Sequence, residues 1–151
     1  MAAAPFERSA RRGYIAGFTA TLLLAVVGQV VLPLLPEGRN PVDAIQDFGY
    51  SFTGICLLGG FMLARRARNA PDRIPAQEPE NLRRIVWREY LGVAFMCMLS
   101  ALFGAIYWGL GGRPVERHAR TFIALGPAAY LALAPRPSRW RDSDRARSAV
   151  K

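Results

Sequence analysis

The chain has 151 residues, of which 52% are hydrophobic, yet its 20 Lys and Arg outnumber its 11 Asp and Glu and give a net charge of +9. This apolar content excludes an intrinsically disordered chain, and the charges fall in blocks between long apolar runs. The alternation is typical of a polytopic membrane protein. No nucleic-acid-binding motif accompanies the arginines, so we expect no nucleic acid partner.

Four apolar runs follow one another along the chain and predict an all-α bundle of four transmembrane helices. The membrane domain is expected over residues 13–135, with spans at about 13–35, 44–64, 90–112 and 121–135. At 1.5 Å per residue, the first three are long enough to cross a hydrocarbon core of about 30 Å. The fourth has 15 residues between Arg120 and Arg136 and contains Pro127, so a re-entrant segment stays an alternative.

The Lys and Arg residues are distributed unequally between the segments that flank these runs. Segments 1–12, 65–88 and 136–151 hold 16 of them, and the other two connections hold four. Because cationic loops resist translocation, we expect both termini in the cytoplasm. The basic tail over 136–151 is expected to be disordered, with Trp140 as its one sizeable anchor. The near absence of lysine suggests a GC-rich bacterium, and hence the bacterial inner membrane.

The composition of the spans and connections predicts how the helices pack. Residues 36–43 are rich in turn-forming types, so spans one and two should be antiparallel neighbours. Gly54, Gly59 and Gly60 make span two smooth, which favours a place at the bundle centre or against another subunit. In residues 65–88, three prolines favour an extended first half, followed by an amphipathic helix that leads into span three.

Aromatic and basic side chains at the predicted membrane boundaries suggest anchors in the lipid interface. Trp87 and Trp108 are separated by about 31 Å along a helix, which matches the thickness of the hydrocarbon core. The arginines would contact anionic lipid head groups, the default partner of this charge. The expected anchors are Trp87, Tyr90, Tyr107, Trp108, Arg65, Arg66, Arg83, Arg84 and Arg88.

A few polar residues fall within or near the spans. Asp47 is the best intramembrane candidate, because an ionisable group in a membrane is costly and usually has a purpose. It also lies so near the connection that an interfacial position, paired with Arg39, is the simpler interpretation. The alternative is a polar pocket in the outer half of the bundle that binds a lipid head group, a quinone ring or a proton. Its expected members are Gln29, Gln46, Asp47, Tyr50 and Ser51.

Metal and haem chemistry have little support. The single histidine, His118, falls in a predicted outer loop, where a solvated side chain is the simplest expectation and proton or metal handling with Glu116 the alternative. Cys56 and Cys97 fall at similar depths in spans two and three but are weak metal-ligand candidates, because buried cysteine usually behaves as a small hydrophobe. We assign no catalytic residue and expect no cofactor within this chain.

The sequence favours an accessory or structural subunit of a larger membrane complex, because the spans are rich in packing residues and poor in ligands. Two other functions stay open. One is a homo-oligomeric transporter, channel or holin-like pore that uses the region of Asp47 and Gln29. The other is a membrane enzyme acting on lipid or quinone, although the scarcity of titratable groups weighs against an enzyme.

Overall fold

The computed structural model describes residues 5–39, 42–73 and 79–140. Within these ranges the chain is all-helical, as predicted, and contains no strand. The helices are α1 (Pro5–Val31), α2 (Val42–Arg73), α3 (Pro79–Gly111) and α4 (Glu116–Leu133), with 3₁₀ turns at Leu32–Leu34 and Arg113–Val115.

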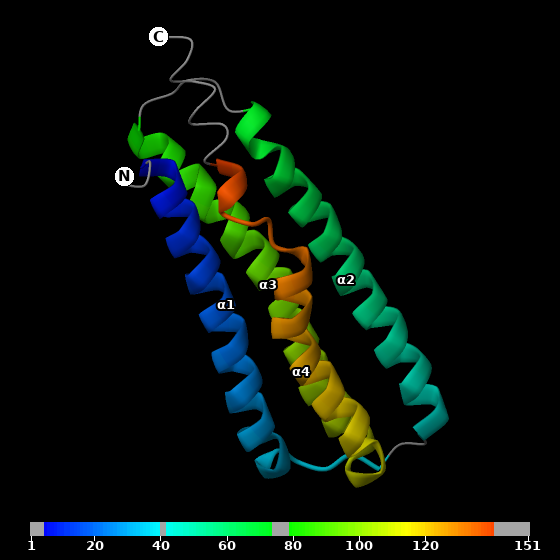
Figure 1. Cartoon of the computed structure of the whole chain (residues 1–151). Helices are drawn as coiled ribbons and strands as arrows, with labels where there is room; N and C mark the ends of the chain where they lie inside the picture. Colours follow the sequence, from blue (N-terminus) through cyan, green and yellow to red (C-terminus); the bar gives the residue numbers. More distant parts are fainter. Residues whose placement is uncertain (1–4, 40–41, 74–78, 141–151) are drawn as a thin grey trace.

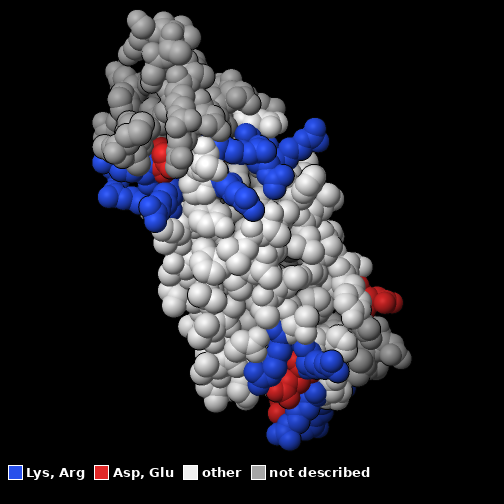
Figure 2. Space-filling model, viewed as in Figure 1, with Lys and Arg blue, Asp and Glu red and all other residues white. Residues whose placement is uncertain are grey.

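Three of the four helices are long and apolar enough to cross a membrane. The candidate spans are Glu7–Leu34, Asp47–Asn69 and Arg83–Gly111, which overlap the first three predicted spans. Figure 2 shows charged side chains at the two ends of the molecule and an uncharged belt between them. These features indicate a membrane protein. The fourth helix does not meet the same criterion, since it is shorter and opens with charged residues.

The helices extend beyond the predicted apolar runs at the arginine-rich end. α1 begins at Pro5, α2 continues to Arg73 and α3 begins at Pro79. An apolar run marks the depth of the bilayer, whereas Ala and Arg continue a helix equally well outside it. Proline is favoured at a first helical position, as at Pro5 and Pro79. The expectation of an extended chain after residue 64 is therefore wrong as far as Arg73, and residues 74–78 lie outside the described ranges.

α3 occupies the centre of the molecule and contacts each of the other three helices (Figure 1). α1 runs parallel to α3, while α2 and α4 run antiparallel to it. α1 lies along both α3 and α4, whereas α2 packs mainly on α3 at the edge. The prediction that α2 lies at the centre of the bundle is thus wrong. The predicted antiparallel orientation of α1 and α2 is observed, but the two helices are not neighbours, because α3 and α4 separate them.

The connection between α1 and α2 explains this separation, because it passes across the end of α3 instead of reversing tightly. The indole Nε1 of Trp108 donates a hydrogen bond to the carbonyl of Leu35 (3.2 Å). Gly38 lies so close to the backbone of Leu110 that a Cβ would have no room there. Arg113 pairs with Glu37 (3.1 Å) at the same end.

α4 returns along α3 in a close antiparallel register. The Ser100 hydroxyl donates to the carbonyl of Phe122 (2.5 Å), and further along the Tyr90 hydroxyl donates to the carbonyl of Pro135 (2.9 Å). Between these contacts the backbone of Cys97 lies against Gly126. The helix is continuous through Pro127 and runs toward the arginine-rich end.

Three tyrosines join α1, α3 and α4 near the arginine-rich end. The ring of Tyr14 contacts those of Tyr90 (6.1 Å between centroids) and Tyr130 (5.6 Å), and the Tyr130 hydroxyl donates to the carbonyl of Tyr14 (3.1 Å). Gly13 and Gly17 make room for these rings, because a Cβ at Gly17 would collide with the Tyr130 hydroxyl. This glycine pair therefore accommodates tyrosine side chains rather than a close backbone contact.

The chain that follows α4 is ordered as far as it is described. Trp140 is only 3% exposed and packs against Ala10, Val86 and Tyr90, so the indole fills the gap between α1 and α3. The prediction that Trp140 anchors the tail is confirmed, but the prediction that the tail is disordered is wrong for residues 136–140. Residues 141–151 lie outside the described ranges.

Candidate functional site

The predicted polar pocket is divided between two sides of α4. The Nε2 of Gln29 donates to the carbonyl of Arg120 (2.8 Å), and the Arg120 guanidinium donates to the Gln29 Oε1 (3.0 Å). Arg120 also pairs with Glu116 (2.8 Å). Gln29 therefore serves the contact between α1 and α4 and is not the deep member of a shared pocket.

The other predicted members belong to α2, on the far side of α4. Asp47 and Ser51 are exposed, and Tyr50 is half exposed but presents its ring to α4. The side chain of Gln46 lies outside what the structure describes. Among the described residues, the ion pairs at this end join Arg113 to Glu37 and Arg120 to Glu116, so the expected pair between Asp47 and Arg39 is not one of them.

An outer aromatic cluster, formed by Tyr50, Tyr107, His118 and Phe122, stands where the pocket was expected. The His118 ring meets Tyr50 (6.4 Å) and Tyr107 (6.3 Å) edge-on, and Phe122 packs against Tyr107 (5.3 Å). The Nδ1 of His118 and the hydroxyl of Tyr107 are buried without a hydrogen-bond partner among the described residues. Imidazole and phenol can each donate and accept, so this cluster can hydrogen-bond a carbonyl or exchange a proton.

The solvated loop position expected for His118 is therefore wrong. α4 begins at Glu116, two residues earlier, and carries the half-buried histidine under Tyr107 of α3. Sequence reasoning missed Tyr107 as its neighbour, because the two residues belong to different helices with no short motif between them. Only the antiparallel register of α3 and α4 brings them together.

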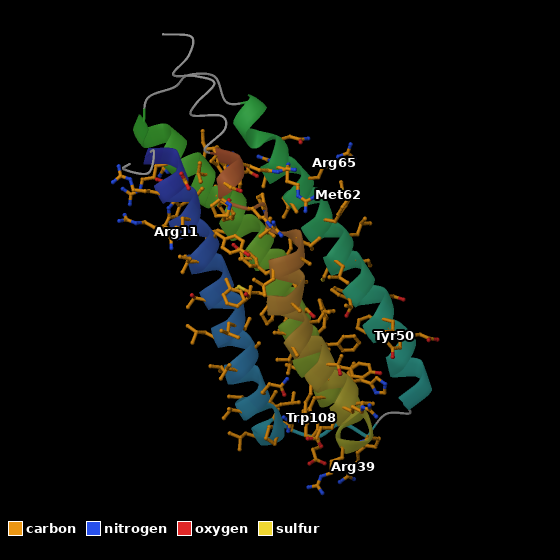
Figure 3. The ribbon with its side chains drawn as sticks, in the orientation of Figure 1. Arg11, Arg39, Tyr50, Met62, Arg65 and Trp108 are labelled. Carbon is orange, nitrogen blue, oxygen red and sulfur yellow. The ribbon has the colours of Figure 1, made fainter. Side chains whose placement is uncertain are left out.

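The expected lipid anchors fall into two groups. Arg65, Arg66, Arg83, Arg84 and Arg88 are all exposed, and Trp87 is half-buried. Figure 3 shows Arg11 and Arg65 at one end of the molecule and Arg39 at the other. Tyr90, Tyr107 and Trp108, in contrast, are at most 2% exposed. These three rings are buried between helices, which corrects the prediction that they contact lipid.

Cys56 and Cys97 lie in the packed region between α2 and α3. Cys56 and Cys97 are buried and free, and the described residues hold no group of three or more His, Cys, Asp or Glu that could bind a metal ion. Neighbouring Gly59 provides the space for the methyl group of Met96, so this part of the interface between α2 and α3 is made for packing.

Comparisons with known protein families, curated proteins and solved structures find no match. The described residues themselves offer three features that can carry a function. These are the outer aromatic cluster, the exposed arginines at the opposite end, and the outward face of α2.

Proposed function

We propose that the protein crosses the bacterial inner membrane four times, with both termini in the cytoplasm, and serves as an accessory or structural subunit of a larger membrane complex. α4 supports the fourth crossing, because its 18 residues return to the arginine-rich end and span about 27 Å. Segments 1–12, 65–88 and 136–151 carry 16 of the 20 Lys and Arg residues. The helix ends that adjoin them all lie at one end of the molecule, which agrees with the positive-inside rule.

The outer end of α4 is suited to a membrane boundary despite its charges. Arg120 is matched by Glu116 and by the side chain and backbone oxygens of Gln29. These hydrogen bonds lower the cost of placing the guanidinium near the hydrocarbon region. The short apolar stretch of α4 can therefore insert with its first turn at the head groups.

The subunit role rests on one observation, the outward face of α2. This face repeats at helical spacing, so its residues form one continuous stripe. It consists of Ser51, Gly54, Ile55, Leu58 and Met62. The three large side chains are 60–65% exposed, and among the described residues a Cβ added at Gly54 would meet no atom within 4 Å beyond its own helix turn.

A transmembrane helix of a partner subunit fits this face better than lipid does. Small residues such as Gly54 and Ser51 let two backbones approach closely, which drives helix association in membranes. The outward face of α1 differs, because its exposed residues over 22–31 are mostly leucine and valine and resemble the lipid chains themselves. α2 packs mainly on α3, with a few contacts to α4, and both helices lie on one side of it, which leaves the opposite side open.

The positions of Asp47 and Gln29 favour the subunit role over a transport pathway that uses both residues. Gln29 bonds to Arg120 on one side of α4, and Asp47 is exposed on α2 beyond the other side. A single polar path would have to pass through the packed α3–α4 interface between them.

The test is purification of the tagged chain from native membranes in mild detergent, followed by mass spectrometry of co-purifying proteins. Wild type should retain defined partners at a fixed ratio. The variant Gly54→Leu should lose them while remaining folded, because the new side chain meets only the partner. Gly109→Leu is the matched control, since Gly109 is also exposed with nothing within 4 Å, but on α3. Equal recovery of all partners by Gly54→Leu and Gly109→Leu, or a partner-free wild type, would contradict the proposal.

A further inference from the structure

A groove runs along α3 at the arginine-rich end and extends to α2. Among the described residues, α3 alone lines its larger part, and α2 contributes only to the smaller part. It combines two adjoining cavities of about 740 Å³ and 320 Å³, which share Arg88 and Gly92. We call it the inner groove. Its lining residues include Arg84, Arg88, Leu91, Gly92, Phe95 and, on α2, Leu63 and Arg66.

The mouth of the inner groove is cationic. Arg84 and Arg88 are exposed and lie one turn apart on α3, and neither pairs with a carboxylate among the described residues. Among the described lining residues the one acid is Glu89, which is 6% exposed and is matched by Arg66 at 3.3 Å. Two guanidinium groups therefore remain available to an anion that approaches the mouth.

The floor of the groove is apolar and leads away from the arginines along α3. Arg84, Arg88, Leu91 and Phe95 follow one another at intervals of three or four residues, which places them on one helix face. Leu91 is 45% exposed and Phe95 61%, and Gly92 leaves space beside Leu63. From Arg88 to Phe95 the stripe is about 10 Å long, which covers about two thirds of the depth of one leaflet of hydrocarbon.

We propose that the inner groove binds one anionic phospholipid, with its phosphate on Arg84 and Arg88 and one acyl chain along Leu91, Gly92 and Phe95. A free phosphate ion would use the arginines but would leave the apolar floor uncovered, whereas a lipid matches both in one molecule. The inference depends on insertion into a membrane and not on the subunit role of α2. Basic segments attract anionic lipids in general, and the inner groove would hold one such lipid at a defined position.

Trp87 provides a direct readout, because its indole lines the groove. The purified chain is reconstituted into phosphatidylcholine vesicles that contain brominated phosphatidylglycerol or, in parallel, brominated phosphatidylcholine, and tryptophan quenching is measured. The signal of Trp87 is the difference between wild type and Trp87→Phe. Phosphatidylglycerol should quench Trp87 more strongly than phosphatidylcholine at the same mole fraction.

The double variant Arg84→Gln/Arg88→Gln should reduce the relative affinity for phosphatidylglycerol by about fivefold per arginine. Gly92→Leu should reduce it too, without a change of charge, because the new side chain fills the floor shared by both cavities. The control Arg11→Gln/Arg12→Gln removes two exposed arginines at the same end of the molecule, on α1, and should leave the preference unchanged.

Equal quenching by the two lipids in the wild type would overturn the proposal, as would a preference that survives in Arg84→Gln/Arg88→Gln. If the control Arg11→Gln/Arg12→Gln also loses the preference for phosphatidylglycerol, the preference comes from the overall charge of this end. If added inorganic phosphate abolishes the preference, the arginines form a simple anion site. Either result refutes a lipid groove. If neither brominated lipid quenches any tryptophan, membrane insertion itself is refuted along with the site.

Discussion

Replacing Gly104 by alanine should separate α3 and α4 at a point where their backbones lie close together. A Cβ at position 104 would lie 2.6 Å from the carbonyl oxygen of Ala119 and 2.5 Å from the Ile123 side chain. The Ile123 side chain can rotate away, but the carbonyl oxygen of Ala119 belongs to the backbone and cannot. An ordinary contact between a Cβ and another heavy atom begins at about 3.4 Å. The backbones of α3 and α4 must therefore move apart by about 0.8 Å at this point. Overpacking of this kind costs about 1–3 kcal/mol, against a gain of about 0.5–1 kcal/mol for alanine over glycine in a helix.

We therefore expect Gly104→Ala to lower the free energy of unfolding by up to about 2.5 kcal/mol, measured by tryptophan fluorescence during reversible unfolding in mixed detergent micelles. Gly54→Ala is the matched control, because an added Cβ there touches nothing and only the gain in helix propensity remains. If both variants are equally stable, α3 and α4 are not as close as the structure places them, and the register on which the position of α4 depends is wrong.

Three further substitutions test individual hydrogen bonds in the same unfolding assay. Tyr90→Phe should lower the free energy of unfolding by about 1–3 kcal/mol, because the buried carbonyl of Pro135 loses its donor. Tyr107→Phe should change it by less than about 0.5 kcal/mol, since the deleted hydroxyl has no partner among the described residues, and a larger loss would reveal one. Ser100→Ala should cost about 0.6 kcal/mol, typical of a hydrogen bond between membrane helices, and no loss would mean that the contact with Phe122 does not form.

The membrane-crossing elements could be predicted from the sequence because hydropathy depends on local composition alone. The three longest apolar runs overlap the three candidate spans. The helix ends could not be predicted in the same way, since arginine and alanine continue α2 beyond the apolar run and the helix persists through Pro71 to Arg73, against the low helix propensity of proline. The neighbour relations were also out of reach, because they depend on the path of the connection that seats Leu35 and Gly38 against α3.

The candidate site could be predicted only in part, because the sequence indicates the depth of a residue in the membrane but not its neighbours on other helices. The exposed arginines follow from their positions beside the spans, and the structure places them on the surface. Membrane depth alone placed Gln29 and Tyr50 in one pocket, but depth does not specify which side of a helix a residue faces. His118 and Arg120 are two residues apart on α4 and point about 200° apart, so Tyr50 packs against one and Gln29 bonds to the other.

The most direct test of the account is the location of the chain on either side of α4, because the proposed topology depends on a fourth crossing. Single cysteines are introduced by Arg39→Cys or Ser138→Cys into a background in which Cys56 and Cys97 are replaced by alanine, and intact cells are treated with a membrane-impermeant maleimide. Both positions are exposed, at opposite ends of the molecule. The account predicts that Arg39→Cys is labelled from outside and that Ser138→Cys is labelled only after lysis. Labelling of Ser138→Cys in intact cells would contradict it, because α4 would then end on the outer side.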